Sequence, residues 1–247
     1  MRRLQFLYRI WVLCLKDMKL YYFKGPTIVM GILMPLFVWL AFVAGRGFSF
    51  TESLPALITL ASFFASSSIT PIVMPWEARQ KSLEMLLSKP VTIYIVLLGT
   101  ALASSIFGIF ISSVLVTIGL LLNVIPRDLI SLALGIAVSS LCYSFMGLVF
   151  SAIPSDVPAD AVMLSSAVRL PLIFVSGIFI PVHSLPHYVK PLAFISPLTY
   201  FSDLIKNAYG YSSLLSPSID VIALLLLTII FAALALAANK RTLTRRL

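Results

Sequence analysis

The chain has 247 residues, of which 60% are hydrophobic and only 11% are charged, and its mean hydropathy is +1.05. Because roughly a quarter of the residues of a soluble domain are charged, this composition excludes a water-soluble globule. The apolar runs are long and continuous, so they predict helices that cross a bilayer and not the alternating strands of a transmembrane barrel. The net charge of +9 is interpreted as Lys and Arg at the ends of the spans, and nucleic acid is not expected as a partner.

Residues 1–24 are expected to form a separate amphipathic helix that lies in the cytoplasmic interface of the membrane. Basic side chains such as Arg9, Lys16 and Lys19 recur on one side of a helix, and apolar side chains lie mostly opposite. Gly25 and Pro26 end this helix before the first span. The alternative is a basic flank without defined structure.

Residues 25–247 are expected to form one all-α membrane domain with six spans. The spans are predicted at residues 27–44, 54–74, 91–122, 130–153, 162–180 and 219–238. With both termini in the cytoplasm, 14 of the 18 Lys and Arg residues lie on the cytoplasmic side, which fixes the orientation. We therefore expect a multi-pass protein of the plasma or inner membrane.

Residues 181–216 follow the fifth span on the outer side. The apolar piece within them, residues 191–205, is too short to cross the bilayer and is interrupted by Pro197. Together with Pro181, Pro186 and Pro191, this pattern predicts two short re-entrant helices with a turn between them.

The cytoplasmic loop at residues 76–90, here called the coupling segment, is predicted to contain a short helix between Pro75 and Pro90. Its polar residues, Glu77, Lys81, Glu84 and Ser88, recur at helical spacing, and the first two are in the favourable order for an ion pair. Leu83, Leu86 and Leu87 form the opposite face. Because the polar face carries charges of both signs, docking in the groove of a partner protein is favoured over lying on lipid.

Two stretches are similar to a known family. The pattern Arg-x-x-Ser-Leu-Glu-x-Leu-Leu-Ser-x-Pro in the coupling segment resembles the cytoplasmic signature of the ABC-2 family of exporter permeases. A second match runs from Ser176-Gly-Ile-Phe-Ile-Pro181 through Leu185-Pro186 to Ser196-Pro-Leu-Thr-Tyr200 and Asp203. One departure is Lys81 followed by Ser82, where the family commonly has Gly followed by Thr.

The resemblance implies a membrane permease with separate partners. It implies that a cleft of an ATP-binding subunit, present in two copies, receives the coupling segment, and that a second permease chain, identical or different, completes the membrane part. The residues assigned to this contact are Glu77, Arg79, Lys81, Leu83, Glu84, Leu86 and Leu87. No Lys follows a Gly in this chain, so ATP and Mg are expected in the partner, and this chain is expected to hold no cofactor, metal or catalytic residue.

In the resembled family the second and fifth spans border the translocation path. The candidate path residues are Phe63, Phe64, Ser66 and Ser67 in the second span, and Phe174, Ser176 and Phe179 in the fifth. The alternative is that the small hydroxyl residues only allow close helix packing. A wall of hydroxyl and aromatic groups suits an amphipathic or lipid-like substrate.

Charged residues are nearly absent from the predicted spans, and Arg169, a turn or two into the fifth span, is a candidate gate or structural charge. It is predicted to pair with Asp156 or Asp160, or else to extend to the interface.

Two other classes of protein remain as alternatives. An intramembrane protease or lipid-modifying transferase needs a catalytic pair or a metal site, and the two histidines, His183 and His187, are separated by a helix-breaking Pro186. An ion-coupled carrier needs acidic or His residues at mid-membrane, and the spans offer no such set.

Overall fold

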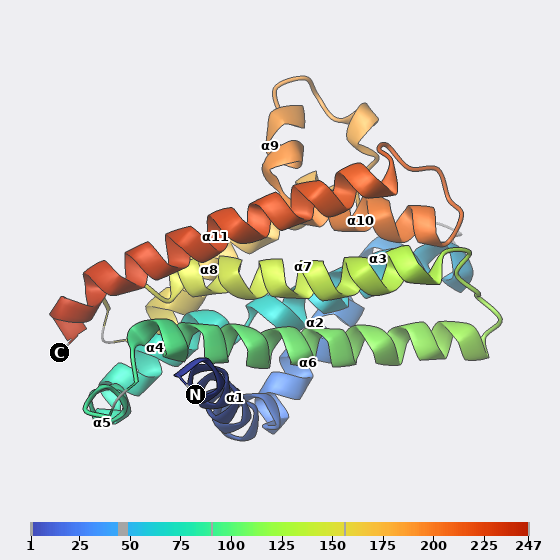
Figure 1. Ribbon diagram of the computed structural model, residues 1–247. Coiled ribbons are helices and arrows are strands. Elements are labelled where there is room, and N and C mark those ends of the chain that lie inside the picture. Colours follow the sequence, from blue (N-terminus) through green and yellow to red (C-terminus); the bar gives the residue numbers. More distant parts are fainter. Residues whose placement is uncertain (1, 44–48, 90, 156, 247) are drawn as a thin grey trace.

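The computed structural model of the protein describes residues 2–43, 49–89, 91–155 and 157–246. The regular elements of these residues are helices, and the long ones lie side by side in a bundle (Figure 1). The elements are α1 (Arg2–Asp17), η1 (Met18–Tyr22), α2 (Gly25–Val43), α3 (Phe50–Ser67), α4 (Thr70–Arg79), α5 (Ser82–Leu87), α6 (Ile93–Leu121), α7 (Leu129–Phe150), α8 (Pro158–Val175), η2 (Val182–Ser184), α9 (Lys190–Ile195), α10 (Pro197–Ala208) and α11 (Pro217–Arg246).

The described residues include five helical stretches that are each long and apolar enough to cross a membrane. They cover residues 50–79, 93–121, 129–150, 158–175 and 217–243. A sixth is reached when Leu4–Tyr22 and Thr27–Val43, which are bent by 86° relative to each other, are counted as one broken span. The prediction of a multi-pass helical membrane protein is therefore confirmed, whereas the end of the predicted first span, residue 44, lies outside the described residues.

The second span is longer than predicted and is broken once. It begins at Phe50, because Ser49 and Glu52 form a capping box that satisfies the first amide groups of α3. The helix lapses at Ser68 and resumes as α4 at Thr70, and Pro71 in the first turn of α4 has no amide hydrogen to bond back to α3. The span then runs through Pro75 to Arg79 instead of ending at Met74.

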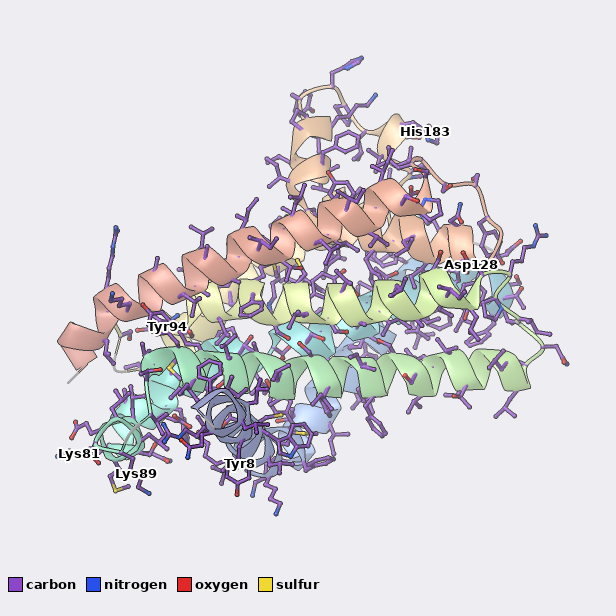
Figure 2. The ribbon with its side chains drawn as sticks, viewed as in Figure 1. Tyr8, Lys81, Lys89, Tyr94, Asp128 and His183 are labelled. Carbon is purple, nitrogen blue, oxygen red and sulfur yellow. The ribbon has the colours of Figure 1, made fainter. Side chains whose placement is uncertain are left out.

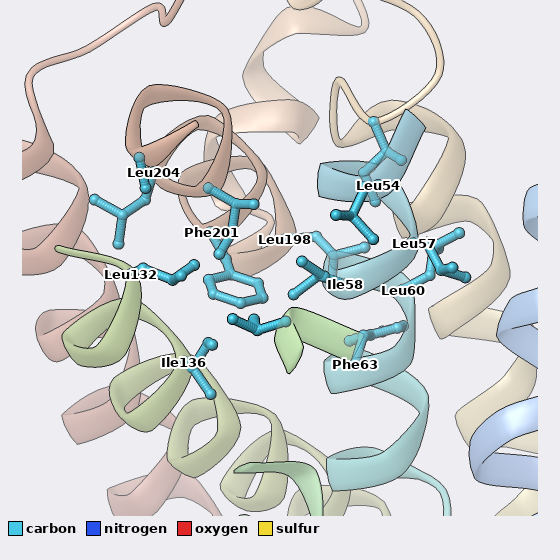
Figure 3. Packing of buried hydrophobic residues seen from close by; sticks show 14 of the residues in the cluster. Leu54, Leu57, Ile58, Leu60, Phe63, Leu132, Ile136, Leu198, Phe201 and Leu204 are labelled. Atoms are coloured by element: carbon cyan, nitrogen blue, oxygen red, sulfur yellow. The ribbon is translucent and has the colours of Figure 1, made fainter. Parts of the chain in front are cut away.

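The main apolar core lies where α3, α7 and the short helix α10 meet (Figure 3). Ile58 and Phe63 of α3 face Leu132 of α7, and Leu198 and Phe201 of α10 fill the space beside them; all are almost fully buried. After α8 the outer segment contains the short 3-10 helix η2 and then the two predicted short helices, α9 and α10, and α10 is held in place by this core.

The N-terminal helix α1 crosses α6 at a steep angle, and Figure 1 shows it almost end-on beneath α6. Gly99 of α6 permits the close approach, because a Cβ at this position would lie 2.8 Å from the Cβ of Leu13 and 3.3 Å from the carbonyl oxygen of Ile10. Both ends of the drawn chain lie at the same end of the bundle as α5 (Figure 1).

We expect Gly99→Ala to loosen α1 from α6. The added methyl group meets the Leu13 Cβ and main-chain atoms of α1, which cannot rotate away, so the free energy of unfolding should fall by about 1–3 kcal/mol. The measurement is thermal unfolding of the purified protein in detergent. Gly25→Ala is the matched control, since a Cβ at Gly25 meets nothing within 4 Å; equal melting temperatures for the two variants would contradict the close approach.

Candidate functional site

The coupling segment forms a corner between two helices and not the single helix predicted from the sequence. Helix α4 ends at Arg79, and Lys81 then adopts a left-handed conformation with φ of 56° before α5 begins at Ser82. This conformation is unfavourable for residues with a Cβ and is the one that Gly adopts readily. The position is the one at which the resembled family commonly has Gly, so the backbone geometry explains that family residue. Pro90, the expected end of the segment, lies outside the described residues.

The corner separates the residues that were predicted to share one polar face. Glu77 belongs to α4 and is only 1% exposed, whereas Lys81 and Glu84 are exposed beyond the break. The predicted ion pair between Glu77 and Lys81 is therefore wrong. The carboxylate of Glu77 contacts the ammonium group of Lys16 on α1.

Five residues form a polar cluster between the N-terminal segment, α4 and α6, here called the Lys16 cluster: Lys16, Asp17, Tyr21, Glu77 and Thr100. The Lys16 ammonium group also lies 3.0 Å from Asp17 Oδ1, and the Thr100 hydroxyl donates to Asp17 Oδ2 at 2.6 Å. The Tyr21 hydroxyl lies 3.5 Å from Glu77 Oε1. Since buried carboxylates are stable only with such partners, these contacts fix α1 against the α4–α5 corner.

Sequence reasoning missed this cluster because it placed Lys16 on the basic face toward lipid headgroups. The one available signal was Asp17, a single acidic residue within the basic residues 1–24.

The surface that the corner presents to a partner differs from the predicted one. Leu83 is 1% exposed and packs in the core with residues of α4 and α6, and Leu86 and Leu87 are half-buried. The exposed residues include the predicted Arg79, Lys81 and Glu84 and also Met85, which is 65% exposed and was not predicted. Figure 2 shows Lys81 and Lys89 at the tip of this corner.

The candidate path residues of the second span are buried within this chain. Phe63 and Phe64 lie in the core, and the ring of Phe63 meets Tyr143 edge-on at 5.0 Å. Ser66 and Ser67 are fully buried, and the Ser104 hydroxyl donates to the Ser66 carbonyl oxygen at 2.5 Å. These contacts favour the helix-packing alternative for the small hydroxyl residues of α3.

The candidate path residues near the fifth span are arranged differently. Phe174 of α8 is 45% exposed, and Phe179 is partly buried. Their rings lie 5.5 Å and 4.0 Å from that of Phe42 in α2, while Ser176 is buried and donates to the Ile173 carbonyl oxygen. The seven candidates therefore do not line one open surface of this chain.

Arg169 is buried, its guanidinium lies 5.9 Å from the ring centroid of Phe64, and its hydrogen bonds are to hydroxyl groups. Its guanidinium donates to Ser67 at 3.2 Å and to Ser68 at 3.0 Å, beside the break between α3 and α4. The predicted pair with Asp160 is not formed, because the carboxylate of Asp160 accepts a hydrogen bond from Ser155 at the start of α8. Asp156, the other predicted partner, lies outside the described residues.

The end of the bundle away from α5 contains a cavity of 550 Å³, here called the outer cavity because the sequence predicts this side to face outward. Its walls come from the start of α3, the turn after α8, the polar side of α10 and residues 211–214. His183 lies at its edge, and no group of His, Cys, Asp and Glu suited to a metal ion occurs among the described residues.

This combination of several apolar spans, one broken span and a helical corner at one end defines a multi-pass helical membrane protein. The chain belongs to the ABC-2 type transporter family, which its sequence matches over residues 8–209. It is 25% identical over 170 residues to the probable multidrug ABC transporter permease YbhR of Escherichia coli (strain K12), and equally to the protein of that name from Escherichia coli O157:H7. The alignment covers 68% of this chain and 45% of each relative, so the chain spans about half the length of the curated relatives it matches.

Lys81→Gly should stabilise the corner. A left-handed conformation costs a residue with a Cβ roughly 1–2 kcal/mol, and Gly removes this cost. Because Gly also loses more conformational entropy on folding, the free energy of unfolding is expected to rise by only about 0.5 kcal/mol. The melting temperature is the readout. Lys81→Ala keeps the Cβ and should give no gain, so a rise with Ala equal to that with Gly would refute the explanation.

A second substitution tests the Lys16 cluster. Glu77→Gln removes the charge that binds Lys16, and the free energy of unfolding should fall by about 2 kcal/mol, as for other hydrogen bonds to charged groups. Glu84→Gln, at an exposed position seven residues further on, should change it by less than about 0.5 kcal/mol. The double-mutant cycle combines Glu77→Gln with Lys16→Met. If the changes in the free energy of unfolding of the two single variants add up to that of the double variant, the two side chains do not interact in solution.

Proposed function

We propose that this chain is the membrane permease subunit of an exporter driven by ATP. In this proposal two ATP-binding subunits hydrolyse ATP with Mg, and their movement changes the access of a path formed with a second permease chain. The cargo is amphipathic or lipid-like. Membership of the ABC-2 type transporter family supports the proposal, as do the names of the two relatives, which are called probable multidrug ABC transporter permeases.

The observation that carries the proposal is the α4–α5 corner. Its exposed residues include Arg79, Lys81, Glu84 and Met85, which combine charges of both signs with a large apolar side chain and so suit a groove in a protein. Behind them, Glu77 connects the corner to α1 through Lys16. A displacement of the corner by a bound subunit therefore reaches α1 and α6 through the Lys16 cluster.

The proposed location is the plasma or inner membrane, with both termini in the cytoplasm and α1 in the cytoplasmic interface. Two observations support this orientation: 14 of the 18 Lys and Arg residues lie on that side, and both chain ends lie at the same end of the bundle as the corner. Leu7 and Trp11 of α1 are exposed on the surface of this chain, as expected for a helix whose apolar side rests against lipid.

We place the path at the surface where α8 faces a second permease chain. Only 28% of the apolar window of α8 is buried within this chain, and Phe174 is among its exposed side chains. Phe63, Phe64, Ser66 and Ser67 then support the path from behind and do not line it. The rival proposal, an intramembrane enzyme, finds less support because the exposed His183 and His187 have no acidic residue between them.

Met85→Asp tests the corner as the docking surface. The side chain is exposed, so the substitution should leave the melting temperature unchanged, while a charge in the apolar part of the contact should weaken binding of the ATP-binding subunit by about tenfold or more. The measurement is co-purification of that subunit with the tagged chain in mild detergent, together with ATPase activity. Leu83 is unsuitable for this test, because a charge at a buried position would disrupt the fold itself.

The matched control is Tyr188→Asp, which places the same charge at an 81% exposed position in the outer segment. Association that survives Met85→Asp unchanged would move the docking surface elsewhere. If no ATP-binding subunit accompanies the unaltered chain under any condition, the proposed function fails.

A further inference from the structure

The outer cavity has two chemically different sides. Apolar groups from Pro55 and Ala56 of α3 and from Ile178 and Val182 after α8 form one side, and α10 forms a polar side. Its volume of 550 Å³ lies within the range of roughly 300–1,000 Å³ found for sites that hold small molecules.

The polar side follows from the helical spacing of α10. Thr199, Ser202, Asp203 and Lys206 are three or four residues apart, so they share one face of the helix, and all four line the cavity. The Ser202 hydroxyl is buried and finds no hydrogen-bond partner among the described residues. A buried hydroxyl without a partner is costly, which points to a ligand group that completes its bonding.

Lys206 is the cation of this face. Its ammonium group donates to the Gly177 carbonyl oxygen at 2.6 Å, and no carboxylate lies within 4.0 Å of it among the described residues. Burial lowers the pKa of the Lys206 ammonium group, and the charge of Asp203 offsets only part of this effect. An ammonium group with one acceptor retains two further protons that can be donated.

The two acidic residues of the cavity are already engaged. The Asp203 carboxylate accepts hydrogen bonds from the backbone amides of Leu214, at 2.8 and 2.9 Å, and Leu215, at 2.8 Å. Glu52 is exposed at the edge of the cavity, and its Oε2 accepts a hydrogen bond from the Ser49 amide in the capping box. On the polar side formed by α10, the donor groups left for a ligand are those of Lys206 and Ser202, while His183, Ser212 and Ser213 line other parts of the cavity.

We propose that the outer cavity binds an amphipathic anion. Its carboxylate or phosphate group accepts hydrogen bonds from the Lys206 ammonium and the Ser202 hydroxyl, and its apolar body lies against Pro55, Ala56, Ile178 and Val182. This inference rests on the proposed function, in which the cavity receives cargo at the outer end of the path. It narrows that cargo from amphipathic molecules in general to anionic ones.

The test measures binding of decyl phosphate to the purified chain in nanodiscs of neutral phosphatidylcholine, with empty nanodiscs subtracted. Lys206→Met should weaken binding by about tenfold, because one charge-assisted hydrogen bond is lost, and Ser202→Ala by about threefold. Lys206→Arg should restore binding to within about threefold, since it keeps the charge. Lys190→Met is the control, because this lysine of the outer segment does not line the cavity and its loss should have no effect.

Two further ligands test whether binding depends on the anionic group and whether the cavity prefers cations, and one lipid tests whether the bound anion comes from the bilayer. Decanol should bind no more weakly to Lys206→Met than to the unaltered chain. Dodecyltrimethylammonium should bind weakly to both; tighter binding of this cation than of decyl phosphate would overturn the proposal and assign the cavity to cations through Glu52. If phosphatidylglycerol in the nanodisc displaces decyl phosphate, the anion comes from the bilayer, and if it does not, a soluble amphiphile is the ligand.

Equal affinity of decyl phosphate for the unaltered chain and Lys206→Met, both with unchanged melting temperature, would also overturn the proposal. If Lys206→Met unfolds, Ser202→Ala decides in its place. This result is independent of the co-purification experiment. If decyl phosphate binds through Lys206 but no ATP-binding subunit co-purifies with the chain, the proposed function fails. If the subunit co-purifies but binding of decyl phosphate does not depend on Lys206, only this inference fails.

Discussion

The ammonium group of Lys16 lies between carboxylates from two helices, Asp17 at the end of α1 and Glu77 near the end of α4. Thr100 holds Asp17 from α6, so three elements that are distant in sequence meet at one charged group. Both carboxylates are almost fully buried, and separating them from Lys16 would leave negative charge without a partner in an apolar setting. The positions of α1 and of the corner are therefore not independent, and each is defined only while the other is in place.

Contacts between charged groups fix the position of the corner, whereas at the opposite end of the bundle apolar packing fixes the position of α10. Helix α10 enters the core between α3 and α7, and it is held by the fully buried side chains of Leu198, Phe201 and Leu204. Its other face carries the polar residues of the outer cavity. The same twelve-residue helix thus both closes the core and shapes the cavity, because its apolar and polar residues follow the period of the helix.

The sequence predicts the helical spans well, because a bilayer demands long apolar runs and these runs are visible without any tertiary information. It also predicts the two short outer helices, because their prolines limit the length of a helix by a local effect that needs no tertiary information. It does not predict the corner at Lys81, because lysine has no preference for a left-handed conformation and only the tertiary fold imposes it.

The contacts of the charged residues also could not be predicted from the sequence. Glu77 and Lys81 are four residues apart, and the helical rule for ion pairs favours their contact, but the break between them leaves Glu77 to a residue 61 positions earlier. Arg169 likewise meets hydroxyl groups about 100 positions away and not the acid in its own helix. Local spacing rules hold only while the helix that carries them is continuous.

The break at Ser68 in the second span has a mechanical consequence. A continuous helix of 30 residues would transmit any tilt of its cytoplasmic end along its whole length, whereas a helix interrupted between Ser68 and Thr70, next to Pro71, bends more easily at that point. The part beyond the break, α4, has ten residues and is about 15 Å long, so a given change of angle at the break displaces α5 by only a short distance. Arg169 donates to hydroxyl groups at this break, so α8 is hydrogen-bonded to the joint between α3 and α4 and would take part in any change of angle there.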